Sequence, residues 1–170
     1  MTGKQYFGAT VLYLLSDGSL SPAPSPLGLE DRSITDHQIT ASSFYSSTLT
    51  PFAGRLNDAD YWAARVGESN PWLQVDFETT VIIMGIQIQG AGRIEQWVTD
   101  IQVEFGTEES ALTPIEESGV ILNFPANFNS EGTKHLKFPH RLVARYLRII
   151  VKDYIRHPAM RLEVMGYRCM

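Results

Sequence analysis

Residues 73–77 read LQVDF, in which apolar and polar residues alternate strictly. Residues 82–88, 97–105 and 160–164 alternate in the same way. The apolar sets expected to share a face are Leu73, Val75 and Phe77; Ile82, Met84, Ile86 and Ile88; Thr99, Ile101, Val103 and Phe105; and Met160, Leu162 and Val164. Because successive side chains of a strand point to opposite faces of its sheet, each set predicts a strand with one apolar face. No comparably long segment has the period of an amphipathic helix, so the sequence predicts an all-β sandwich or barrel with its function on the loops.

The composition is that of a folded, acidic chain. It has 170 residues and 19.1 kDa, with 44% hydrophobic and 19% charged residues. That length predicts one domain whose core needs no metal or disulfide. The net charge of −5 and the pI near 5.3 argue against a general nucleic-acid binder, which needs a basic surface. No apolar run approaches the roughly 20 residues of a membrane span, so no transmembrane span is expected.

The N-terminal part of the chain allows two interpretations. Residues 6–15 read YFGATVLYLL and lie shortly after Lys4, which is similar to the charged start and apolar run of a signal peptide. An ordered edge strand over residues 9–15 explains the same run. The proline-rich residues 21–26 then lead into the compact domain, because proline disfavours helix and removes strand donors. We therefore expect an extension over residues 1–25 and one domain over residues 26–170.

The sequence offers few groupings of reactive side chains. Its four histidines, which lack metal-ligand spacing, are His37, His135, His140 and His157. No nucleophile elbow, phosphate-binding loop or dinucleotide fingerprint occurs, and Cys169 is the only cysteine. The loop carboxylates Asp58 and Asp60 could bind calcium, although their spacing matches no calcium-loop signature. The sequence thus predicts a protein that is not an enzyme and has no cofactor, with calcium as the alternative.

Short motifs spread over most of the chain resemble one family. In order they are ITASS (residues 39–43), GRLN (54–57), WLQVDF (72–77), QGAG with QWVT (89–92 and 96–99), VARYLRI (143–149) and MRLEVMGY (160–167). Their order and approximate spacing resemble those of discoidin domains, the C-type domains of coagulation factors V and VIII. The opening PLGLE of residues 26–30 also resembles the start of that family, so the resemblance covers residues 26–169.

The resemblance implies an eight-stranded, distorted jelly-roll β-barrel or sandwich without catalytic activity. In that family a few protruding loops at one end, often called spikes, hold the ligand. Depending on the member, the ligand is an anionic phospholipid headgroup, collagen, another cell-surface protein or a glycan. Most members are extracellular, so the resemblance implies an extracellular or cell-surface module.

Two features depart from the family pattern. The family usually joins its ends by a disulfide; Cys169 matches the second cysteine, whereas Ala23 or a neighbour stands at the first position. Losing such a bond typically costs ~2–5 kcal/mol, so the core or the N-terminal strand has to compensate. The missing partner also weakens the inference of an oxidising compartment. Residues 108–114 are simply acidic, where the family commonly has a Ser-x-Asp-Gly turn followed by tryptophan.

The resemblance places the first spike at residues 46–54. Its Leu49 and Phe52 are apolar residues that flank Pro51 in a loop of small residues. When exposed, each would contribute about 1.5–3 kcal/mol by inserting into a membrane interface or a partner's pocket. The alternative for Phe52 is a cap over the end of the barrel.

The second spike maps to residues 90–97, with Arg93 and Ile94 at its tip. A guanidinium beside an apolar residue suits a phosphate or carboxylate, because it donates to both oxygens. Trp97 begins an alternating strand and is therefore expected in the core.

A third loop, residues 57–66, carries side chains that could stack on a sugar ring or contact a protein. The candidate ligand-binding residues of these loops are Leu49, Phe52, Arg55, Asp58, Tyr61, Trp62, Arg65, Arg93 and Ile94. Charged residues within strands have a structural interpretation instead, because charges near a sheet are usually paired. Asp76 is accordingly expected to form an ion pair with Arg145 or Arg148.

These predictions favour a non-enzymatic adhesion or recognition module whose loops bind a protein, a glycan or an anionic phospholipid. Few basic residues surround the loop tips and the chain is acidic overall. Phosphatidylserine is therefore a weaker candidate ligand than a protein or a glycan. The alternative is a carbohydrate-binding lectin, with or without calcium. Either function requires that Leu49, Tyr61 and Ile94 cluster at one water-facing rim.

Overall fold

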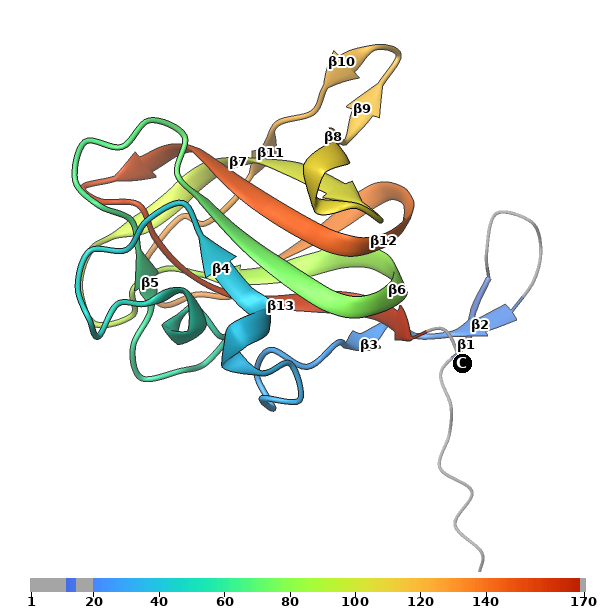
Figure 1. Cartoon of the computed structure of the whole chain (residues 1–170), viewed down its shortest axis with the longest axis horizontal. Helices are drawn as coiled ribbons and strands as arrows, with labels where there is room; N and C mark the ends of the chain where they lie inside the picture. Colours follow the sequence, from blue (N-terminus) through green and yellow to red (C-terminus); the bar gives the residue numbers. More distant parts are fainter. Residues whose placement is uncertain (1–11, 15–19, 169–170) are drawn as a thin grey trace, which may run out of the picture.

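The computed structural model describes residues 12–14 and 20–168, which form a β-sandwich with short flanking elements (Figure 1). Its strands are β1 Leu12–Leu14, β2 Leu20–Pro22, β3 Ser25–Pro26, β4 Ile39–Ala41, β5 Trp62–Ala63, β6 Trp72–Gln89, β7 Trp97–Gly106, β8 Thr113–Pro114, β9 Glu116–Glu117, β10 Val120–Ile121, β11 Phe124–Pro125, β12 Lys134–Ile155 and β13 Ala159–Arg168. The 3₁₀ helices are η1 Asp36–Gln38, η2 Pro51–Ala53 and η3 Glu109–Ala111. The all-β prediction is confirmed. Within the described residues no helix is long and apolar enough to cross a membrane.

One nine-stranded antiparallel sheet forms the body, in the order β11-β7-β12-β6-β13-β3, with β4 paired to β6, β5 to β13 and β8 to β7. The first half of β12 pairs with the second half of β6, starting at Lys134 opposite Ile88. The second half of β12 pairs with the first half of β6, as far as Ile150 opposite Trp72. Both long strands therefore turn back through a corner (right in Figure 1), and each contributes to both layers of the sandwich.

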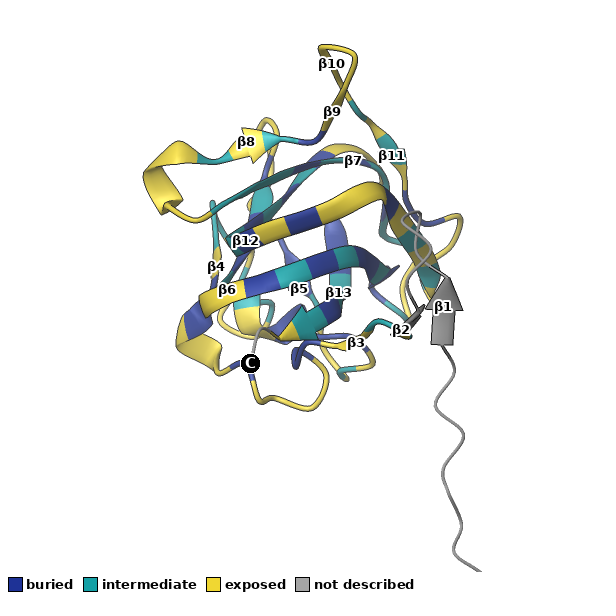
Figure 2. Cartoon of the chain, turned by 90° about the vertical axis from the view of Figure 1, so that its right-hand side faces the viewer, coloured by how far each residue is buried: buried dark blue, intermediate teal, exposed yellow. Residues whose placement is uncertain are grey.

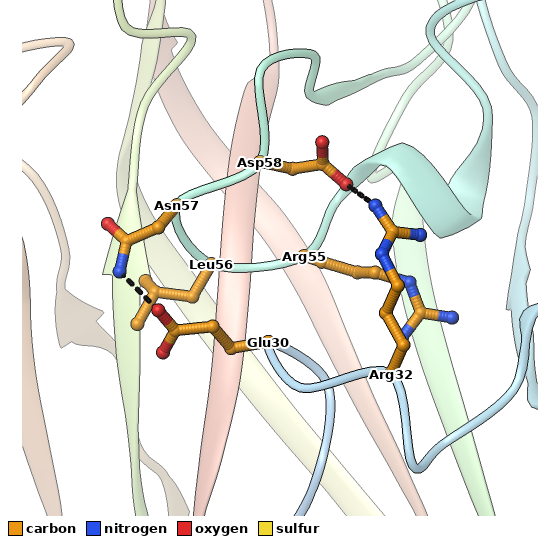
Figure 3. Close-up of a pocket in the computed structure, with 6 residues that line it drawn as sticks. All are labelled: Glu30, Arg32, Arg55, Leu56, Asn57 and Asp58. Carbon is orange, nitrogen blue, oxygen red and sulfur yellow. Dashed lines mark hydrogen bonds and ion pairs between the residues drawn. The ribbon is translucent and has the colours of Figure 1, made fainter.

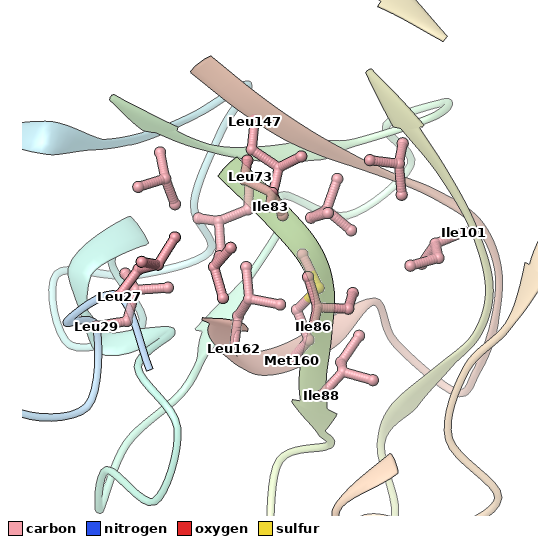
Figure 4. Packing of buried hydrophobic residues seen from close by; sticks show 14 of the residues in the cluster. Leu27, Leu29, Leu73, Ile83, Ile86, Ile88, Ile101, Leu147, Met160 and Leu162 are labelled. Atoms are coloured by element: carbon pink, nitrogen blue, oxygen red, sulfur yellow. The ribbon is translucent and has the colours of Figure 1, made fainter. Parts of the chain in front are cut away.

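The core lies between the two layers and is built from aliphatic side chains of every long strand (Figure 4). The two short alternating sets are confirmed as core residues: Leu73, Val75, Phe77, Met160, Leu162 and Val164 are all buried. Each such side chain stabilises the fold by about 1.5–3 kcal/mol through burial. A domain of this size therefore has a core that can hold its loops rigidly.

The predicted face of β6 is only half right. Ile86 and Ile88 are buried as expected, but Ile82 and Met84 are half-buried. In their place Val81 and Ile83 point into the core. The pairing of β6 with β13 skips Met84, because Met165 lies opposite Gly85 and Gly166 opposite Ile83. This β-bulge inserts one residue and so exchanges the inner and outer faces, which strict alternation cannot anticipate.

A similar irregularity in strand pairing changes which side chains of β7 face the core. Ile101 and Val103 are buried as predicted, whereas Thr99 and Phe105 are only half-buried. The register against β12 shifts around Asp100, and Val98 rather than Thr99 is buried. Trp97, expected in the core, is half-buried and does not belong to the core cluster, so that prediction is wrong.

The start of the domain is tied to its last strand without a disulfide. The buried carboxylate of Glu163 accepts backbone hydrogen bonds from Gly28, Leu29 and Glu30 at 3.3, 3.2 and 2.8 Å. Gly28 has a φ of +117°, and a Cβ there would lie 1.9 Å from the hydroxyl of Ser33, so only glycine fits. These bonds tie residues 28–30 to β13; Cys169 lies outside the described residues.

The N-terminal segment is described only in part. Within it, β1 pairs with β2 in a two-stranded sheet of its own. The rest of the predicted strand over residues 9–15 lies outside the described residues. The Tyr167 hydroxyl donates to the carbonyl of Pro22 at 2.6 Å, which anchors the chain beside β13. The boundary at residues 25 and 26 stays a prediction.

Candidate binding rim

Several loops converge on one end of the sandwich (left in Figure 1). We call this end the rim. The rim loops are residues 42–50, 64–71, 90–96, 126–133 and 156–158. They join strands of both layers, so the sheet itself brings these distant segments of the chain together.

The first group of rim loops is held by polar and aromatic contacts. The backbone N–H of Tyr45 donates to the carbonyl of Ala63 at 2.8 Å. The Tyr45 ring meets the His157 ring edge to face, with centroids 5.4 Å apart. A ring nitrogen of His157 lies 2.7 Å from the carbonyl of Ala64. Ser43 donates to the carboxylate of Glu68. Three loops of the rim are thus locked against one another.

The remaining rim loops are joined to this group. The backbone N–H of Gly92 donates to the carbonyl of Ser130 at 2.8 Å, and Arg156 pairs with Glu95 at 2.7 Å. Gly90 permits the close approach of residues 90–96 to residues 126–133, because a Cβ there would lie 2.8 Å from the Cα of Ser130. The segments around residues 90–96, 126–133 and 156–158 therefore form one connected surface.

Arg161, on β13, fixes two loops from beneath. Its guanidinium donates to the carbonyl of Gly90 at 2.9 Å and to the carbonyl of Asp58 at 3.0 Å. Burial lowers the pKa of Arg161, opposed by the nearby Asp58 and Glu131 carboxylates. Such charge-assisted bonds to backbone carbonyls hold loop positions more firmly than neutral ones.

A small apolar cluster lies under the rim. Ala63, Ala91 and Ala159 are its buried members, and the half-buried Leu49 and Tyr61 pack against them. Burial, together with the nearby Asp60 carboxylate, raises the pKa of the Tyr61 phenol. Leu49 and Tyr61 therefore pack against one cluster, but both are half-buried beneath the rim, whereas Ile94, the third residue predicted to share a water-facing rim with them, is exposed and lies outside that cluster.

The protruding side chains are mostly different ones. The large apolar rim residues with high exposure are Phe44 at 51%, Tyr45 at 58%, Val66 at 70%, Ile94 at 43% and Phe128 at 75%, and the adjoining end of β12 exposes Tyr154 and Ile155. Among these, sequence reasoning had identified only Ile94. Two signals could have found others: the adjacent pair Phe44 and Tyr45 cannot both face a core, and Phe128 stands between two asparagines.

Cations and carboxylates are mixed around these apolar residues. Arg65 and Arg93 are exposed, as a ligand-binding role requires. The Lys134 ammonium lies 4.7 Å from the centroid of the Phe128 ring. Acidic side chains, including Glu68 and Glu95, are interspersed and engaged with rim partners. The rim is therefore an apolar surface of mixed charge rather than a basic patch.

Two predicted ligand-binding residues are buried, so those predictions are wrong. Arg55 is 1% exposed; its guanidinium donates to the carbonyls of Leu29 and Ile34 at 2.8 and 2.7 Å and pairs with Asp36 at 2.7 Å. Trp62 is fully buried, and its indole N–H donates to the carbonyl of Ser43 at 2.9 Å. Both side chains fill the base of the loops, where sequence alone could not distinguish a loop tip from a loop root.

Asp58 lies in a polar cleft beside the rim (Figure 3). Its carboxylate pairs with Arg32 at 2.5 Å, and the neighbouring Asn57 amide donates to Glu30 at 2.7 Å. A second cleft on the other side of the Arg32–Asp58 pair is lined by the exposed Phe52. Each cleft has a volume of about 310 Å³.

The suggested calcium ligands do not form a cluster. Asp58 is engaged by Arg32, and Asp60 is exposed nearby. No group of three or more potential metal-ligating side chains occurs among the described residues. Calcium requires several oxygen ligands, and the Asp58 carboxylate is already paired with a guanidinium.

The predicted strand ion pair is present. Arg145 donates to both oxygens of Asp76 at 2.8 Å, and this hydrogen-bonded pairing lowers the pKa of Asp76. Arg148 instead donates to Gln74 at 2.9 Å and lies over the ring of Trp72. Both arginines therefore make contacts with side chains of β6.

Comparisons with known proteins agree with this architecture. The family model described as "F5/8 type C domain" matches residues 38–164. Rat lactadherin is 32% identical over 171 residues, covering 94% of this chain and 40% of its own length. Dog coagulation factor VIII is 34% identical over 149 residues, covering 83% of this chain and 6% of its own. The chain thus spans less than half the length of these relatives.

Solved structures with low identity share the fold. Wild-type discoidin II from Dictyostelium discoideum has a TM-score of 0.70 at 17% identity, covering 78% of this chain and 55% of its own. The family 32 carbohydrate-binding module of Clostridium perfringens NanJ was solved in complex with galactose. It has a TM-score of 0.62 at 12% identity, and the match covers 78% of this chain and 97% of the module.

Proposed function

Because the chain belongs to the F5/8 type C, or discoidin, family, we propose that it is a non-catalytic recognition domain that docks on the interface of a phospholipid membrane through its rim. The supporting observation is the set of large apolar side chains that separate rim loops expose at one end of the sandwich. A soluble domain rarely exposes so many large apolar groups together unless they contact a partner.

The chemistry of the exposed side chains suits a bilayer interface. Phe128 and Ile94 can each remove apolar area from water, worth about 1.5–3 kcal/mol when fully buried. Tyr45 and Tyr154 combine an apolar ring with a hydroxyl, which favours the headgroup region. Arg65 and Arg93 can contact lipid phosphates. Because carboxylates are interspersed, we expect anionic lipid to strengthen binding only modestly.

Vesicle sedimentation tests this proposal with a matched pair of variants. The double variant Ile94→Ser/Phe128→Ser removes two rim side chains, and Val120→Ser/Ile121→Ser removes two equally exposed apolar side chains of the β9–β10 hairpin. On phosphatidylcholine vesicles with and without phosphatidylserine, the rim variant should lose most of the binding and the hairpin variant none. Equal binding by wild type and rim variant would contradict membrane docking through these residues.

A glycan ligand is the second candidate, favoured by the polar clefts around the Arg32–Asp58 pair. The exposed Phe52 ring lines the second cleft together with hydroxyl and carboxylate side chains, so a sugar ring can stack on it while its hydroxyls form hydrogen bonds. A glycan array with Phe52→Ala as the variant tests this candidate. Loss of a specific sugar signal in Phe52→Ala, but not in Ile94→Ser/Phe128→Ser, would place the glycan site in the clefts.

We extend the proposal to three further properties. The domain catalyses no reaction, binds its ligand without a metal, and acts outside the cell or at its surface, as part of a longer protein or alone. Ligand binding should accordingly be unchanged by EDTA. A loss of vesicle or glycan binding on chelation, restored by calcium, would contradict the metal-free part of the proposal.

A further inference from the structure

A groove of about 400 Å³ lies on the outer face of β6, β12 and β13, at the start of β12 and the end of β13, and none of its lining residues belongs to the rim loops. Its walls come from three adjacent strands and from Pro24, which precedes β3. This volume is in the range of small-molecule sites, which typically measure about 300–1,000 Å³. Neither the proposed membrane contact nor the polar clefts use this surface.

One cross-strand row in the groove lacks a side chain at its centre. Gly85 lies between Lys137 of β12 and Met165 of β13 in the paired register. A Cβ at Gly85 would lie 2.1 Å from the carbonyl oxygen of Leu136, so no larger residue fits this position. The row of side chains is therefore interrupted at its centre. The bulge at Met84 adds a half-buried thioether to the floor.

The two ends of the groove differ in chemistry. At the β12 end, His135 and Lys137 are exposed. At the β13 end the lining is Met165, Pro24 and Tyr167, and the Tyr167 hydroxyl is engaged by the Pro22 carbonyl at 2.6 Å. No carboxylate lines the groove in the described part of the chain, although the whole chain carries a net charge of −5. The site is locally cationic at one end and apolar at the other.

We propose that this groove binds a medium-chain aliphatic carboxylate, a fatty acid. The carboxylate accepts hydrogen bonds at Lys137 and His135, and the alkyl chain crosses Gly85 toward Met165 and Pro24. Adjacent strands are about 4.8 Å apart, so a path across three strands is about 10 Å long, which suits a chain of medium length. The two thioethers supply polarizable, adaptable contacts for an alkyl chain.

Calorimetric titration of the full chain with decanoate tests the proposal. Wild type should bind saturably, and decanol, which lacks the charge, should bind more weakly. Lys137→Gln should weaken decanoate binding by about fivefold, the upper end for an exposed ion pair. Met165→Glu, which places a carboxylate in the alkyl path, should weaken it by more than about tenfold. Arg141→Gln is the matched control, an exposed cation of the same strand outside the groove.

Several results would overturn the inference: no saturable decanoate binding, equally tight binding of decanol, or equal losses in Lys137→Gln and Arg141→Gln. Binding that emerges only after deletion of residues 1–21 would assign the groove to that segment of the chain and likewise contradict the proposal. The rim variant Ile94→Ser/Phe128→Ser should retain decanoate binding, so this inference and the proposed membrane function fail independently.

Discussion

The rim and the β9–β10 hairpin both expose large apolar side chains, yet they are built in opposite ways. The hairpin projects from the body and is mostly exposed (Figure 2), with Val120 at 63% and Ile121 at 45%. Its strands form a two-residue ladder of their own, closed by Ser118 and Gly119 with positive φ. The rim loops are instead cross-linked by hydrogen bonds, an ion pair and Arg161. The proposed binding surface thus differs from the hairpin in that several segments of the chain hold it in place.

The largest expected effect comes from removing the support of the rim. Arg161→Met deletes both bonds to the Gly90 and Asp58 carbonyls and leaves those acceptors partly buried. Each charged bond is typically worth about 1.5–3 kcal/mol, so losing both should lower the free energy of unfolding by about 3–6 kcal/mol. Denaturant unfolding measures this, and vesicle binding should weaken as well.

Arg156→Met is the control for that variant, because its ion pair with Glu95 is solvent-exposed on both sides. It should change stability by less than about 1 kcal/mol. Equal effects of the two substitutions would mean that the rim is not held by Arg161.

A smaller effect is expected from single tip residues. Phe128→Ala removes the most exposed rim side chain, and its stability should change little because that ring packs weakly in the free protein. Vesicle affinity should fall by about fivefold to tenfold, corresponding to about 1–1.4 kcal/mol. Vesicle titration followed by tryptophan fluorescence measures the change. An unchanged affinity would exclude Phe128 from the contact surface.

The loss of stability at acid pH should come from a carboxylate of the β-sandwich and not from the rim loops. The guanidinium of Arg145 holds the pKa of Asp76 below its usual value. A carboxylate with a lowered folded-state pKa stabilises the fold above its unfolded pKa of about 3.9 and loses that contribution as the pH falls through the folded value. Asp76→Asn should therefore lower stability at neutral pH and flatten its decline below about pH 4. An undiminished acid decline in thermal unfolding of Asp76→Asn would contradict this assignment.

The smallest effect is expected in the hairpin. Val120→Ser/Ile121→Ser should leave unfolding and vesicle binding within about 0.5 kcal/mol of wild type, as for surface positions that pack against nothing. Solubility at high concentration is the property expected to improve. A clear loss of vesicle affinity in this variant would erase the distinction between the two regions.

The sequence was sufficient for the fold class, the family and the short alternating strands, because those depend on local periodicity and on motif order. It was misleading where a β-bulge reversed a face, as at Met84 and around Asp100. It also misjudged Arg55 and Trp62, whose polar atoms are satisfied by backbone carbonyls from distant segments. The Asp76 ion pair was predictable, with Arg145 and Arg148 as alternative partners, because charges near a sheet are usually paired. The protruding rim residues required the three-dimensional arrangement of the loops.

Paramagnetic relaxation on lipid nanodiscs tests the central claim most directly. With spin-labelled lipid in the disc, the Ile94 methyl and Phe128 ring signals should broaden strongly, while the Val120 and Ile121 methyl signals stay sharp. Broadening of the hairpin signals instead, or of neither region at saturating disc concentration, would contradict a membrane-docking rim.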